Sequence, residues 1–113
     1  MKKFETLNLE IGRPIVDVAI DKFYSYFNIY KKTNVECILI IHGYGSHGKG
    51  GQIKDVLRDE LEKLKKSGTI KFFINGEDFK ITNAKAYELR YKYEELKNLF
   101  HMTNRGVTVV VIK

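Results

Sequence analysis

The glycine-rich segment from 42 to 51 holds the residue types best suited to a phosphate group. It reads His42-Gly43-Tyr44-Gly45-Ser46-His47-Gly48-Lys49-Gly50-Gly51. Glycine lets backbone N–H groups approach an anion, and a helix that begins after the segment presents the positive end of its dipole. Lys49, with Lys54 and Arg58 in the next helix, would add charge-assisted contacts. We therefore expect a phosphate site made by His42, Gly43, Gly45, Gly48, Lys49, Gly51, Lys54 and Arg58.

The same segment partly matches a nucleotide-binding P-loop. Residues 43–49 spell G-x-x-x-x-G-K, but Gly50 stands where a P-loop has the Ser or Thr hydroxyl that holds magnesium. The sequence therefore predicts phosphate-loop chemistry without ATP or GTP, and no cofactor.

His42 directly follows a strongly apolar stretch, at the point where open α/β sheets place their ligands. An imidazole there could act as general acid or base, or donate to a phosphate oxygen. We expect its side chain to face the same concavity as the glycine-rich backbone. The alternative is a histidine that hydrogen-bonds to the segment and only shapes it. Glu10 is the candidate base or metal ligand beside His42 if the chain cleaves nucleic acid.

Hydrophobic spacing predicts the elements that position these residues. Apolar residues recur at helical spacing after Pro14 and again after Gly51, and β-branched runs indicate strands. The central strand should lie inside a mixed sheet with both long helices packed on it, giving an α/β two-layer sandwich of four strands with βαβ crossovers. The expected strands are 6–10, 35–41, 69–74 and 107–112, the expected helices are 14–30, 53–64 and about 84–100, and a turn is expected at 75–76.

Length and composition suit one globular domain spanning 1–113. The net charge of +6 favours a polyanionic partner, because clustered Lys and Arg release counterions when they meet phosphates. Neither a membrane-spanning stretch nor a signal peptide is expected, so we expect a cytoplasmic protein. Cys37 lies in an apolar run and is interpreted as an inert core residue.

Three motifs resemble those of the Smr (small MutS-related) domain family. They are Ile40-Ile41-His42-Gly43-Tyr44-Gly45, the helix opening Gln52-Ile53-Lys54, and the closing Asn104-Arg105-Gly106-Val107-Thr108-Val109-Val110. Together they cover most of the chain, and residues 76–104 read as an insertion. The resemblance implies a fold similar to the carboxy-terminal domain of the third bacterial translation initiation factor. It also implies DNA or RNA binding, with endonucleolytic nicking in some members.

The chain departs from the family at its first motif. Where many members carry L-D-x-H, whose acid and histidine are implicated in cleavage, this chain has Leu7-Asn8-Leu9-Glu10. We therefore expect a DNA- or RNA-binding domain that contacts the phosphate backbone through its H-G-x-G segment. The alternatives are an endonuclease using His42 and Glu10, with a divalent metal only in that case, and a protein-interaction or phospho-ligand module without nuclease activity. Oligomeric state is left open.

Overall fold

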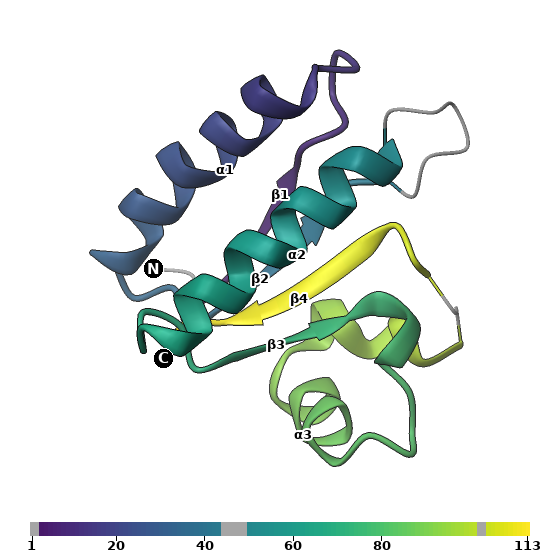
Figure 1. Cartoon of the computed structure of the whole chain (residues 1–113). Helices are drawn as coiled ribbons and strands as arrows, with labels where there is room; N and C mark the ends of the chain where they lie inside the picture. The colour runs from purple at the N-terminus through teal and green to yellow at the C-terminus, as the bar shows by residue number, and fades with distance from the viewer. Residues whose placement is uncertain (1–2, 44–49, 102–103) are drawn as a thin grey trace.

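A computed structural model describes residues 3–43, 50–101 and 104–113 (Figure 1). Strands and helices alternate along the first two thirds of the chain. In order they are β1 (Phe4–Asn8), α1 (Val16–Lys31), β2 (Cys37–Ile41), α2 (Gly50–Lys66), β3 (Phe72–Asn75), the 3-10 helix η1 (Gly76–Asp78), α3 (Ala84–Lys92), the 3-10 helix η2 (Glu94–His101) and β4 (Val107–Val111).

The four strands form one mixed sheet in the order β1-β2-β4-β3. β1 pairs in parallel with β2, whereas β4 runs antiparallel to both of its neighbours. β2 therefore lies inside the sheet, which confirms the expectation for the apolar run, and β1-α1-β2 is the expected βαβ crossover. β1, β2 and β3 all point the same way, so their carboxyl ends share one end of the sheet.

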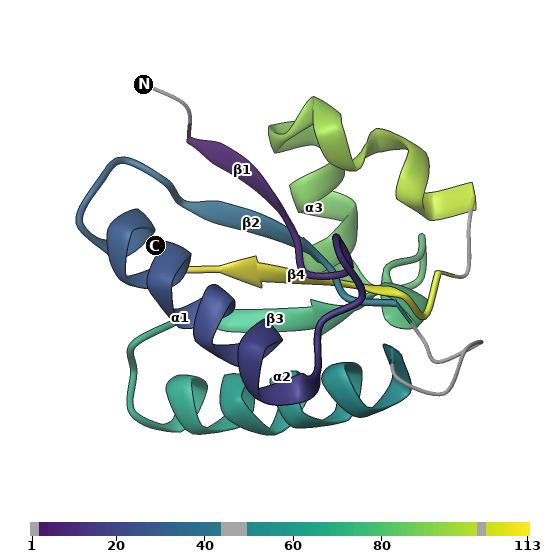
Figure 2. The same cartoon turned by 90° about the horizontal axis from the view of Figure 1, so that it is seen from above.

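Both long helices pack against one face of the sheet, as predicted (Figure 2). Their inward residues join apolar side chains of the strands in a hydrophobic core that includes Phe23 and Phe27 of α1 and Leu57 and Leu61 of α2. Gly68 ends the α2 region at a φ of +78°, the left-handed conformation that suits glycine after a helix. The architecture is thus α/β, with a four-stranded mixed sheet and two helices layered on it.

Residues 76–101, the greater part of the insertion expected at 76–104, cover the opposite face of the sheet (Figure 2). A second hydrophobic cluster joins this segment to the strands, and it includes Leu89 of α3 and Leu96 of η2. The prediction of a single helix over 84–100 was wrong, because the chain becomes extended at Tyr93, with φ −126° and ψ 113°. The Tyr93 hydroxyl donates to Glu36 Oε1 at 2.7 Å and ties this break to the chain just before β2.

Several predicted boundaries shift by a few residues. β1 begins and ends two residues earlier than expected, and Pro14 precedes the helix N-cap at Ile15. The expected turn at 75–76 is replaced by η1, which starts at Gly76.

Cys37 is fully buried, and burial raises its pKa to about 12, so the thiol stays protonated as expected of a core residue. Among the described residues, no helix is both long and apolar enough to span a membrane.

Candidate functional site

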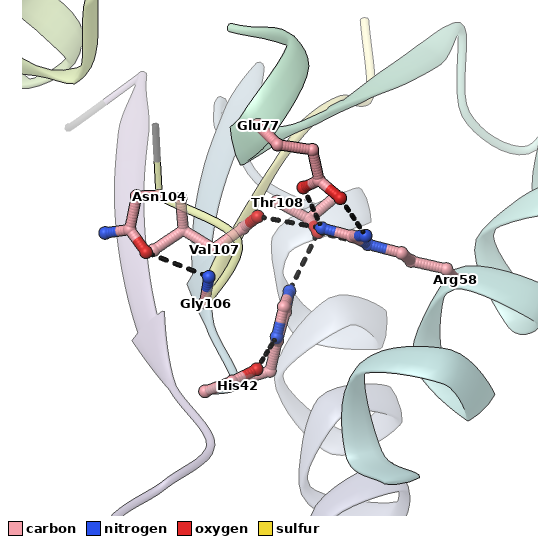
Figure 3. A network of polar contacts seen from close by, with 8 residues as sticks. His42, Arg58, Glu77, Asn104, Gly106, Val107 and Thr108 are labelled. Atoms are coloured by element: carbon pink, nitrogen blue, oxygen red, sulfur yellow. Dashed lines mark hydrogen bonds and ion pairs between the residues drawn. The ribbon is translucent and has the colours of Figure 1, made fainter. Parts of the chain in front are cut away.

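The carboxyl end of β2, the middle of α2, the 3-10 helix η1 and the start of β4 bring four polar side chains together. They are His42, Arg58, Glu77 and Thr108, and we call them the His42 network (Figure 3). Hydrogen bonds join them in one chain from Glu77 to the carbonyl of Gly43. Four separate elements thereby meet where the glycine-rich segment leaves the sheet.

His42 is wholly buried, at 0% exposure, and both its ring nitrogens are hydrogen-bonded. Nδ1 lies 2.7 Å from the Gly43 carbonyl oxygen. A carbonyl oxygen can only accept, so Nδ1 carries the proton and Nε2 is the acceptor of the neutral ring. Nε2 lies 2.9 Å from Thr108 Oγ1, so the Thr108 hydroxyl donates to it. The network therefore fixes one tautomer of His42.

The Thr108 hydroxyl also accepts a hydrogen bond from Arg58 Nε at 3.3 Å. The guanidinium of Arg58 forms a bidentate ion pair with the Glu77 carboxylate, with N–O distances of 2.9 and 2.8 Å. It also donates to the Val107 carbonyl at 3.3 Å. Two parallel charge-assisted bonds of this kind fix geometry as well as adding energy. Arg58 thereby holds η1 and β4 against α2.

Burial lowers the pKa of His42 from 6.5 to about 4, because the charged ring would lose its hydration. The positive charges of Arg58 and Lys54 act in the same direction, while the bond to Gly43 and the charge of Glu77 oppose them. Burial also works to raise the pKa of Glu77, but its contacts with Arg58 outweigh this and hold that pKa below its usual value. At neutral pH the network thus contains a neutral imidazole and one ion pair.

The backbone at the start of the glycine-rich segment is held as firmly as the side chain of His42. The carbonyl oxygen of Gly106 accepts from the amides of both His42, at 2.9 Å, and Gly43, at 3.0 Å. Gly43 has a φ of +76°, which a residue with a side chain adopts only with strain. Gly106 in turn is oriented by Asn104, whose Oδ1 accepts from its amide at 2.8 Å. The chain that leaves β2 is therefore tied to the chain that enters β4.

Glu10 lies beside Gly43. A Cβ atom added to Gly43 would come within 2.5 Å of Glu10 Oε2, so the carboxyl group occupies that space. Asn8, which the resemblance aligned with the Smr aspartate, accepts from the Glu10 amide at 2.8 Å through Oδ1. This side-chain to backbone bond shapes the turn that follows β1. The carboxylate expected near the glycine-rich segment is thus present, but it is exposed.

Gly76 permits the close approach of η1 to the chain before β4. A Cβ atom at this position would lie 2.0 Å from the Asn104 carbonyl oxygen and 2.6 Å from Val107 Cγ2. Such distances leave no room for any side chain. Gly76 therefore allows Glu77, the next residue, to reach Arg58.

The structure places the predicted site residues in different situations. His42 was expected to face a concavity, but its side chain is enclosed and bonded, which agrees with the alternative of a shaping histidine. Arg58 was expected to meet phosphate, but its guanidinium is engaged by Glu77 and only 15% of its side chain is exposed. Lys54 is half-buried, and its charge acts on both His42 and Glu77. Gly45, Gly48 and Lys49 lie outside the described residues, and of Gly51 only the place in α2 is described.

Sequence reasoning missed Thr108 and Glu77. Thr108 lies in the closing motif that was quoted for the resemblance, yet no role was given to its hydroxyl. A signal was present, since a threonine in an otherwise apolar strand must find a hydrogen-bond partner when buried. Glu77 carried no such signal, because its pairing with Arg58 spans 19 residues.

No group of three or more His, Cys, Asp or Glu side chains lies in position to hold a metal ion within residues 3–43, 50–101 and 104–113. The sequence matches no family model, and neither a curated protein nor a solved structure matches it.

Proposed function

We propose that this chain is a nucleic-acid-binding domain. It contacts the phosphate backbone at the glycine-rich segment that connects β2 to α2. The observation that carries the proposal is the anchoring of this segment. Side-chain and backbone hydrogen bonds hold both the amide and the carbonyl of Gly43, the second residue of the segment. A fixed anchor lowers the entropy lost when the following backbone binds a phosphate.

Electrostatics around this end of the sheet support the same proposal. The first turn of α2 carries no acidic residue, so nothing within that turn offsets the positive end of the helix dipole. Lys54 lies one turn further on, and the whole chain carries a net charge of +6. Either DNA or RNA suits such contacts, because phosphate groups carry no sequence information.

The proposal also includes a family and a more specific fold. We infer an Smr-like domain whose sheet and helices resemble those of the carboxy-terminal domain of the third bacterial translation initiation factor, acting in the cytoplasm. The order of motifs from Ile40 to Val110 supports this inference.

Endonuclease activity stays a prediction that no contact among the described residues specifically favours. A general base needs a free lone pair within reach of its substrate. His42 has both nitrogens engaged and lies out of contact with solvent. Glu10 is exposed, but within the described residues no metal-binding group surrounds it. The alternative of a protein-interaction or phospho-ligand module likewise stays a prediction.

Fluorescence anisotropy with labelled duplex DNA and duplex RNA, at several salt concentrations, tests the proposal. Each phosphate contact contributes about 0.9 to the slope of log affinity against log salt on duplex DNA. Lys54→Gln should therefore flatten the slope by about one unit. Lys66→Gln, at the carboxyl end of the same helix, is the matched control and should leave it unchanged. Equal slopes for wild type and Lys54→Gln would contradict the proposal, as would the absence of binding at low salt.

A further inference from the structure

Helix α1 has a second apolar face that nothing in the described structure covers. Its inner face packs Ala19, Phe23 and Phe27 into the core. Away from that face, four large apolar side chains are between 43% and 60% exposed, and they are Ile15, Val18, Tyr26 and Ile29. We call these four residues the α1 stripe. Scattered exposed apolar residues are ordinary, but a contiguous row of them marks an interaction surface.

The spacing of the α1 stripe is symmetric about Lys22. Ile15 and Ile29 each lie seven residues from Lys22, and Val18 and Tyr26 each lie four residues from it. Seven residues make about two helical turns and four make about one, so Val18, Lys22, Tyr26 and Ile29 share one side of α1, and the N-cap residue Ile15 precedes the first turn of that side. A row whose spacing is the same in both directions brings apolar positions opposite each other when two copies run antiparallel.

Lys22 would lie at the centre of such a pairing without bringing two ammonium groups together. Its Nζ donates to the Asn8 carbonyl oxygen at 2.8 Å, at the end of β1 in its own chain. The charged group is thereby directed away from the row, while its methylene stem remains available for apolar contact.

The place of α1 in the fold leaves this side open. α1 lies at one side of the molecule, with α2 as its neighbouring helix on the sheet face (Figure 1). On the outward side no described element packs against it (Figures 1 and 2). This side of α1 is therefore the one that a second helix would approach.

We propose that the α1 stripe pairs with the α1 stripe of a second copy of this chain, in an antiparallel arrangement about a two-fold axis at Lys22. Ile15 then packs against Ile29 of the second copy, and Val18 packs against Tyr26 of the second copy. A two-fold interface requires a patch that complements itself, which this spacing provides. Because the two helices run in opposite directions, the carboxyl ends of the two β2 strands lie at opposite ends of the dimer.

Sedimentation equilibrium of the full chain, from about 1 µM to about 1 mM, measures the association. Wild type should show a reversible monomer–dimer equilibrium. Val18→Asp should weaken it by roughly 100-fold or more, because a carboxylate would be buried against Tyr26 in each half of the interface. Ile81→Asp is the control, since Ile81 is an exposed apolar residue outside the stripe, and it should leave the equilibrium unchanged. Circular dichroism establishes that each variant is folded.

A charge-pair rescue tests the register itself. Val18→Asp combined with Tyr26→Lys places opposite charges against each other twice in the antiparallel dimer and should restore association to within about tenfold of wild type. Val18→Asp combined with Ile29→Lys adds the same charges at positions that do not face each other, so this variant should stay monomeric. A wild-type chain that remains monomeric throughout would overturn the proposal and assign the stripe to a different partner. Equal behaviour of the two double variants would overturn the register.

Discussion

The buried neutral state of His42 predicts that the fold loses stability in mildly acidic solution. The unfolded chain takes up a proton near the ordinary histidine value of 6.5, whereas the folded chain does so only at about 4. Lowering the pH below 6.5 therefore favours the unfolded state, and the loss grows until the pH reaches the folded pKa. From these two values, His42 alone removes about 2 kcal/mol of unfolding free energy between pH 7 and pH 5.

Urea denaturation at a series of pH values between 7 and 5 measures this loss. Carboxylates whose pKa values are lowered by partners, such as Glu77 and Glu36, also make the stability depend on pH. They do so mainly below this window, because the usual carboxyl pKa is 4.5. His42→Gln serves as the control, since it removes the titrating group and keeps a polar side chain. The pH dependence should shrink by about 2 kcal/mol in this variant. A wild-type stability that is flat over the window, or an equal slope in His42→Gln, would refute the reasoning.

Three further changes test the contacts around the site. Thr108→Val leaves the buried Nε2 of His42 without its donor and should lower the free energy of unfolding by about 2 kcal/mol, measured by urea denaturation; an unchanged value would mean that the bond contributes nothing. Gly76→Ala forces a Cβ atom to 2.0 Å from a backbone oxygen and should cost about 3 kcal/mol or prevent folding, as read from thermal melts. Glu10→Gln removes a negative charge beside Gly43 and should raise affinity for duplex DNA roughly threefold in anisotropy titrations. Weaker binding by that variant, or loss of a robust cleavage activity, would favour the endonuclease alternative.

Elements with strong local patterns could be predicted from the sequence. The apolar run that became β2 and the helical spacing in α1 and α2 each give a face to bury, so type and packing follow from neighbouring residues alone. The segment from Gly76 to His101 was different. Its helical spacing suggested one helix, but the break at Tyr93 coincides with a hydrogen bond to Glu36, 57 residues away. Nothing in the local pattern could indicate which face of the sheet the segment would cover.

The site shows the same division between local and distant information. The position of His42 at the end of a buried strand was correct, because strand and glycine segment are adjacent in sequence. Its enclosure agrees only with the alternative of a shaping histidine, and the sequence could not favour that alternative because the partner Thr108 lies 66 residues further along the chain. Arg58 was interpreted as a free cation for the same reason, since its partner Glu77 lies 19 residues further along the chain, beyond β3. Long-range partners decide whether a polar residue faces a ligand or the interior.

The most direct test of the account is an NMR titration of the amide groups with a short duplex at low salt. Binding at the proposed place predicts the largest shift changes at Gly43 and across the start of α2 to Lys54, with little change at Lys66. The affinity derived from the same titration should fall as salt is raised, because phosphate contacts release counterions. Shift changes concentrated on α3, or no changes at saturating duplex, would contradict the account.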